Sequence, residues 1–61
     1  MPIITIELLE GRSEVQKKQI AKEITETLVK NANVKPEAVT ILFHDLKPEN
    51  IAKGGKFLSE K

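Results

Sequence analysis

Cysteine, tryptophan and tyrosine are absent from this 61-residue chain, and histidine occurs once. Without cysteine the chain forms no disulfide, and one histidine without cysteine excludes the ordinary structural zinc sites. A domain of this length buries only about 60% of the surface that its unfolded chain exposes, so it is marginally stable alone. We therefore expect one domain over residues 1–61, without metal or other cofactor, that is stabilised by association with further copies of itself.

An excess of charge of one sign is also missing, because 10 Lys and Arg against 9 Asp and Glu give a formal net charge of +1. Small nucleic-acid-binding domains have a basic face, often with aromatic residues for stacking, and the aromatic residues here are only Phe43 and Phe57. No apolar run approaches the roughly 18 residues that a membrane span needs, and no signal-peptide pattern is present. We expect a cytoplasmic protein that binds neither nucleic acid nor membranes.

The first half of the sequence predicts a strand and then a helix. Ile3–Leu9 alternates in the manner of a β-strand, with one apolar face and one mixed face. Ser13 followed by Gln16 has the pattern of a capping box, and nothing interrupts a helix from there to about Asn31. The apolar residues of that stretch fall on one helix face: Ile20, Ala21, Ile24 and Leu28.

The second half predicts another strand and a short hairpin. Residues Val39–His44 form a β-rich run, the following 47–50 segment is predicted as loop, and Gly54–Gly55 is typical of a hairpin turn within Ile51–Leu58. A strand, a helix and a strand with a crossover of this length predict an α/β fold, a β-α-β unit with parallel strands.

The predicted sheet is incomplete by itself. Two strands leave two open edges, and the outer face keeps Ile3, Leu9 and Leu42, which no predicted element of the chain is available to cover. Both the edges and the face therefore predict that another copy of the chain completes the sheet.

Most catalytic patterns are missing from the sequence. There is no cysteine nucleophile, no G-x-S-x-G, no phosphate-binding loop and no dinucleotide fingerprint. His44 is interpreted as a residue on the solvent or interface side of a strand, and Gly54–Gly55 as a turn rather than a phosphate site. The remaining chemical feature is Pro2. Aminopeptidase normally removes Met1 before so small a residue, and the chain would then begin with a secondary amine that can act as a general base or a nucleophile.

Several features surround Pro2 at matching positions: a following strand, the turn Leu9-Glu10-Gly11-Arg12-Ser13, Gln16-Lys17 early in the helix, and the late Gly54-Gly55 pair. Over nearly the whole chain this arrangement resembles the 4-oxalocrotonate tautomerase family, the small members of the tautomerase superfamily. The resemblance implies a homohexamer built as a trimer of dimers, with a dimer as the smaller alternative. It also implies cofactor-free isomerisation of unsaturated 2-hydroxy or 2-oxo acids, of the kind used in aromatic catabolism.

The same resemblance implies roles for five residues. Pro2 would be the base, and Arg12, supplied by a neighbouring subunit, would bind a substrate carboxylate. Leu9, Thr40 and Ile51 would contact the substrate. Thr40 stands where the family has a second arginine and Ile51 where it has a phenylalanine, so a weaker and broader tautomerase, or one whose substrate is not a diacid, fits better than an efficient diacid tautomerase.

Alternative functions follow from the same residues. Lys53 or Lys56 in the tail would be the replacement cation, although solvated surface is the simpler role for both. The prolyl amine would also serve hydration, dehalogenation or decarboxylation of a related unsaturated acid. A non-catalytic oligomeric binding module is the alternative outside enzymes.

Overall fold

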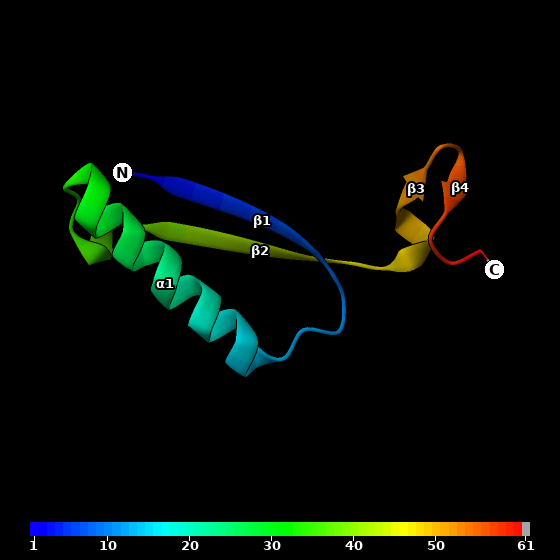
Figure 1. The fold of residues 1–61 in the computed structure, drawn as a ribbon, viewed down its shortest axis with the longest axis horizontal. Helices are drawn as coiled ribbons and strands as arrows, with labels where there is room; N and C mark the ends of the chain where they lie inside the picture. The colour runs from blue at the N-terminus through cyan, green and yellow to red at the C-terminus, as the bar shows by residue number, and fades with distance from the viewer. Residues whose placement is uncertain (61) are drawn as a thin grey trace.

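A computed structural model describes residues 1–60 of the chain. The fold is a β-α-β unit followed by a short hairpin, and Figure 1 shows the two parts at opposite ends of the molecule. This confirms the predicted α/β fold. In chain order the elements are β1 (Ile3–Leu9), α1 (Glu14–Ala32), the 3₁₀ turn η1 (Pro36–Ala38), β2 (Thr40–Leu46), the 3₁₀ turn η2 (Pro48–Asn50), β3 (Ala52–Lys53) and β4 (Lys56–Phe57).

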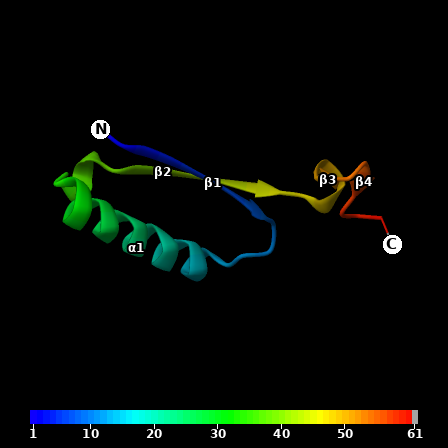
Figure 2. The same cartoon turned by 45° about the horizontal axis from the view of Figure 1, so that its top comes forward.

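The strands β1 and β2 are parallel and pair in register from Ile3 opposite Thr40 to Leu9 opposite Leu46. Helix α1 lies along one side of this two-stranded sheet, as the two views in Figures 1 and 2 show. Exposure alternates along β1, whose half-buried residues are Ile4, Ile6 and Leu8, and whose outer residues are exposed. The alternation agrees with the predicted apolar face of β1 and leaves the other face of the sheet uncovered.

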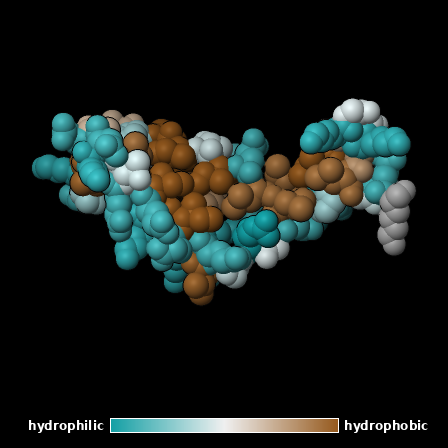
Figure 3. Space-filling model, in the orientation of Figure 1, coloured by the Kyte–Doolittle hydropathy of each residue, from teal (hydrophilic) through white to brown (hydrophobic). Residues whose placement is uncertain are grey.

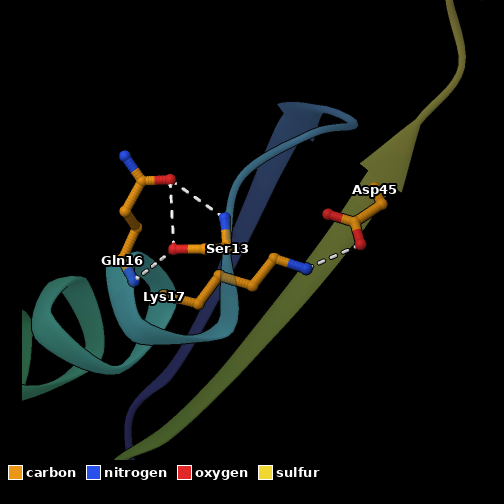
Figure 4. A network of polar contacts seen from close by, with 4 residues as sticks. All are labelled: Ser13, Gln16, Lys17 and Asp45. Atoms are coloured by element: carbon orange, nitrogen blue, oxygen red, sulfur yellow. Dashed lines mark hydrogen bonds and ion pairs between the residues drawn. The ribbon is translucent and has the colours of Figure 1, made fainter.

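Local chemistry fixes where α1 begins and ends. The Gln16 backbone N–H donates to Ser13 Oγ at 3.1 Å, and the Ser13 backbone N–H donates to Gln16 Oε1 at 2.9 Å, which completes the predicted capping box (Figure 4). Asn33 follows the last turn with φ 54°, the left-handed conformation that closes many helices. The helix therefore extends one residue past the predicted end.

The C-terminal arm, residues 51–58, folds on itself. Its strands β3 and β4 pair antiparallel, and the turn between them is made by Gly54 (φ 61°) and Gly55 (φ 82°). A two-residue turn with positive φ at both positions is the type I′ geometry that glycine adopts readily, so the predicted hairpin is confirmed. Figure 1 shows this arm projecting beyond the sheet, at the end of the molecule opposite the N-terminus.

None of the residues 1–60 is fully buried, so this part of the chain has no core of its own. The chain exposes 5016 Å², about 1,000 Å² more than the roughly 4,000 Å² expected for a compact protein of this mass. Its radius of gyration is 14.8 Å, against about 10.5 Å for a compact domain of this length. Figure 3 shows apolar surface continuing from the body of the molecule toward the arm.

The structure differs from the sequence prediction at two places in the second half of the chain. The second strand was predicted over Val39–His44 but runs over Thr40–Leu46, because pairing with β1 continues until its partner Leu9 is reached. The predicted 47–50 loop contains a 3₁₀ turn, in which Pro48 occupies the first position and its carbonyl oxygen accepts from the Ile51 N–H at 3.3 Å. Within residues 1–60, no helix combines the length and apolar character required to cross a membrane.

Candidate active site

Two of the predicted site residues meet at the start of the sheet. The backbone N–H of Thr40 donates a hydrogen bond to the carbonyl oxygen of Pro2 at 3.0 Å, one step before Ile3 pairs with Thr40. Pro2 and Thr40 are both half-buried, whereas Met1, which precedes Pro2, is 88% exposed. The parallel register therefore places the backbone of the candidate base Pro2 beside that of Thr40, the residue expected at the position of the family's second arginine.

The other three residues lie at the opposite end of the sheet. Leu9 ends β1, and the next residue, Glu10, donates its N–H to the Leu46 carbonyl oxygen at 2.8 Å. Gly11 then turns the chain with φ 113°, a conformation that glycine adopts without strain, and the exposed Arg12 follows just before the helix cap. Ile51 follows η2 at the base of the arm, where it is half-buried and its carbonyl oxygen accepts from the Leu58 N–H at 2.9 Å.

The length of β1 separates these two groups. A strand rises about 3.3 Å per residue, so the seven residues of β1 hold its two ends about 20 Å apart. A small organic acid cannot span that distance. Within one chain the structure brings Pro2 together with Thr40, and it does not bring them together with Leu9, Arg12 or Ile51.

The lysines considered as replacement cations lie on the arm. Lys53 and Lys56 are register partners in the β3–β4 hairpin, and both are exposed. Their strands, β3 and β4, lie beyond the end of β2, and Thr40 begins β2 at its other end (Figure 1). Neither lysine therefore supplies a cation to the Pro2–Thr40 end of its own chain.

Grooves in the single chain lie elsewhere. One of about 580 Å³ follows α1 and is lined by residues such as Ala21, Thr25, Val29 and Pro36. A second, of about 240 Å³, lies between α1 and β1 at Ile4. Neither groove contains a predicted site residue. Both follow the flanks of a helix that no second layer covers, so they are exposed packing surface rather than the site described above.

Register also creates contacts that the sequence did not predict. Glu7 and His44 are partners across the parallel ladder, and Glu7 Oε1 lies 3.8 Å from His44 Nδ1. Lys17 Nζ lies 2.6 Å from Asp45 Oδ2, which joins α1 to β2 (Figure 4). Both pairs join residues far apart in sequence, and no local pattern indicates them. In the described residues 1–60 there is no group of three or more potential metal-ligating side chains.

Comparison with known proteins agrees with this fold. The fold is a single β-α-β unit with a C-terminal hairpin, and the chain has proline at its second position. The model of the tautomerase enzyme family matches residues 2–61. The chain belongs to the tautomerase family, as its resemblance to 4-oxalocrotonate tautomerases predicted.

Individual relatives are similar over almost the whole chain. A probable tautomerase of Lactococcus lactis is 41% identical over 61 residues, which cover 100% of both chains. A solved structure from the 4-oxalocrotonate tautomerase isozymes of Methylibium petroleiphilum has a TM-score of 0.89 and 38% identity, covering 95% of this chain and 91% of that one. A heterohexamer 4-oxalocrotonate tautomerase of Chloroflexus aurantiacus has a TM-score of 0.88 and 27% identity, covering 98% and 97% respectively. The similarity supports an enzyme of the isomerase type.

Proposed function

We propose that the protein is a cofactor-free tautomerase of unsaturated 2-hydroxy or 2-oxo acids and that Pro2, after removal of Met1, is its general base. The position of Pro2 carries this proposal. It lies at the open end of the sheet, half-buried beside Thr40, and the one residue before it is 88% exposed. Removal of Met1 would therefore leave a secondary amine at a site that a small substrate can reach.

In the proposed reaction, the prolyl nitrogen takes the proton of the 2-hydroxyl group of an enol or dienol. The electron pair of the broken O–H bond forms the 2-oxo group, and the carbon–carbon double bonds shift. The protonated amine then returns its proton to carbon, which is C3 of a simple enol such as enolised phenylpyruvate and a more distant carbon of a dienol such as 2-hydroxymuconate. Substrate and product are isomers, and the base is regenerated, so no redox partner or second substrate is needed.

Arg12 of a neighbouring copy is proposed to bind the substrate carboxylate. Since the two ends of β1 lie about 20 Å apart, the Arg12 of the same chain is too distant from Pro2. An exposed guanidinium on a loop is free to meet another molecule, and its planar donors match a carboxylate. Leu9 and Ile51 lie at the same end as Arg12 and would reach the substrate in the same way.

Thr40 sets the expected substrate range. Beside Pro2 it offers a hydroxyl where the family has an arginine, and one neutral hydrogen bond contributes about 0.5–1.5 kcal/mol against about 1.5–3 kcal/mol for a charged one. An acid with one carboxylate, held by Arg12, fits this site better than a diacid. Enolised phenylpyruvate therefore represents the favoured class and 2-hydroxymuconate the disfavoured one.

The state of the amino terminus tests the proposal. While Met1 is attached, the Pro2 nitrogen is a tertiary amide, which has neither a basic lone pair nor an N–H. Preparations with different extents of Met1 removal, measured by intact mass, should ketonise enolised phenylpyruvate at rates proportional to the processed fraction, as followed by ultraviolet absorbance.

Two controls make this test decisive. Pro2→Ala in the processed form should lose most of the activity, while a primary amine at this position retains part of it. Lys18→Gln, a change on the exposed side of α1, should leave the rate unchanged. Equal rates in processed and unprocessed protein would exclude Pro2 as the base.

A further inference from the structure

An ion pair joins the first part of α1 to the end of β2. Lys17 Nζ lies 2.6 Å from Asp45 Oδ2, and Figure 4 shows the lysine side chain reaching from the helix across to the strand. Asp45 is the register partner of Leu8, on the face of the sheet that α1 covers, and the preceding residues of β2 on that face are Ile41 and Phe43. A carboxylate at the end of an apolar row needs a partner of opposite charge, and Lys17 supplies it.

This contact closes a ring around the loop that carries Arg12. At one end of the loop, Glu10 donates its N–H to the carbonyl oxygen of the last residue of β2 at 2.8 Å. At the other end, the capping box holds Ser13, whose carbonyl oxygen accepts from the Lys17 N–H at 3.1 Å. The loop is thus tied to the end of β2 twice, through the backbone on one side and through the Lys17–Asp45 pair on the other.

Comparison with the next residue along the helix shows what this pair adds. Lys18 Nζ lies 3.3 Å from Glu14 Oε1 of the same helix, and the two side chains are 75% and 83% exposed. Lys17 is only 24% exposed, and its partner is 28 positions away in the sequence. Since ion pairs near the surface contribute little to the free energy of unfolding, the main effect of the Lys17–Asp45 pair is on the freedom of the loop that it closes.

We propose that the Lys17–Asp45 pair positions Arg12: it holds the loop so that the exposed guanidinium is presented to the carboxylate of a substrate bound at a neighbouring copy. The inference rests on the proposed function, in which Arg12 completes a site that contains Pro2 of another chain. Two donors of the guanidinium must point at the carboxylate for a paired contact, and a loop that is free to move loses part of the binding free energy when it is ordered. Lys17 and Asp45 contact no substrate in this arrangement and act through Arg12.

The ratio of two rate constants tests this role, since a ratio cancels changes in the folded fraction. Enolised phenylpyruvate carries a carboxylate for Arg12, and the enol of its methyl ester does not. Asp45→Asn should lower the ratio of kcat/KM for the acid to that for the ester by about threefold to tenfold, mainly by raising KM for the acid. Lys18→Gln is the matched control and should keep the ratio of the unmodified chain.

Two further variants separate positioning from a merely structural role. In an Arg12→Ala background, Asp45→Asn should leave the ratio unchanged, because the group that the pair positions is missing. Exchange of the two charges, Lys17→Asp together with Asp45→Lys, should restore most of the lost ratio, because opposite charges again face each other. The inference is wrong if folded Asp45→Asn keeps the original ratio, or if the loss is equally large in the Arg12→Ala background.

NMR relaxation of the backbone nitrogens gives a readout that does not depend on turnover. The amides of Gly11 and Arg12 should be more mobile in Asp45→Asn than in the unmodified chain or in Lys18→Gln. Equal mobility in all three would overturn the inference, even with an active unmodified chain. An unmodified chain that converts neither compound would instead contradict the proposed function, and the relaxation comparison would still decide whether the pair orders the loop. If circular dichroism shows that Asp45→Asn does not fold, Lys17→Gln takes its place in each comparison.

Discussion

Lys17 Nζ lies 2.6 Å from Asp45 Oδ2 and joins the first turn of α1 to the last part of β2. Lys17 is 24% exposed and Asp45 47%, so the pair is partly shielded from water. The capping box of Ser13 and Gln16 lies one turn away and fixes the same end of the helix (Figure 4). Together these contacts hold the loop that carries Arg12 against the sheet, although Arg12 itself is exposed.

Lys17→Gln should therefore lower the free energy of unfolding by about 0.5–1 kcal/mol, the upper part of the range for ion pairs near a surface. Urea denaturation at fixed protein concentration measures the change. Lys18→Gln breaks a pair whose side chains are 75% and 83% exposed and should cost about 0.2–0.5 kcal/mol. Equal losses in the two variants would show that the Lys17–Asp45 contact has no special role.

Arg12→Ala should lower kcat/KM for a carboxylate substrate, and the loss should correspond to about 2–5 kcal/mol of transition-state stabilisation. The reason is that the substrate charge loses its partner in a partly desolvated site. Arg12→Lys should recover part of this loss, since it keeps the charge but not the planar pair of donors. Steady-state kinetics on enolised phenylpyruvate measures both. An effect of Arg12→Ala below about 0.5 kcal/mol would place Arg12 outside the site.

Mixed assemblies test whether Pro2 and Arg12 come from different copies. Pro2→Ala and Arg12→Ala chains should each be weakly active alone. Unfolded together and refolded as a mixture, they should regain activity, because some sites then combine an intact Pro2 from one chain with an intact Arg12 from another. Mixing the separately folded variants without refolding is the control. No gain after joint refolding would mean that both groups act within one chain.

Thr40→Arg should raise activity toward 2-hydroxymuconate, because it returns a cation to the position beside Pro2. The ratio of kcat/KM for 2-hydroxymuconate to that for enolised phenylpyruvate is the informative measurement, since it cancels small changes in folding. Thr40→Gln, a neutral side chain of greater length than threonine, is the matched control. A folded and assembled Thr40→Arg variant with an unchanged ratio would show that the site binds its acid in another way.

Features with local causes were predictable from the sequence. The capping box at Ser13, the end of α1 near Asn33 and the hairpin at Gly54–Gly55 each depend on residues within a few positions of one another. The true end of β2 at Leu46 was not predicted, because it depends on where the partner strand β1 ends.

The features of the candidate site also separate into those that the sequence predicted and those that depend on strand pairing. Pro2 and Arg12 became candidates from the sequence, through features that run from Pro2 to Lys17 and include the late Gly54-Gly55 pair. Their separation follows from the strand predicted over Ile3–Leu9, which has the observed bounds. The contact of Glu7 with His44 was not predicted, because it depends on the register between two strands far apart in sequence. Sequence spacing identified the residue types, and the fold determined which of them can meet within one chain.

The lack of fully buried side chains in residues 1–60 also determines how heat would affect this protein. Once copies associate as proposed, separation and unfolding become one step, and the melting temperature depends on how many molecules share the solution. Dilution should then lower the melting temperature just as a destabilising substitution would. Two variants are therefore comparable only when they are melted at the same number of molecules per volume.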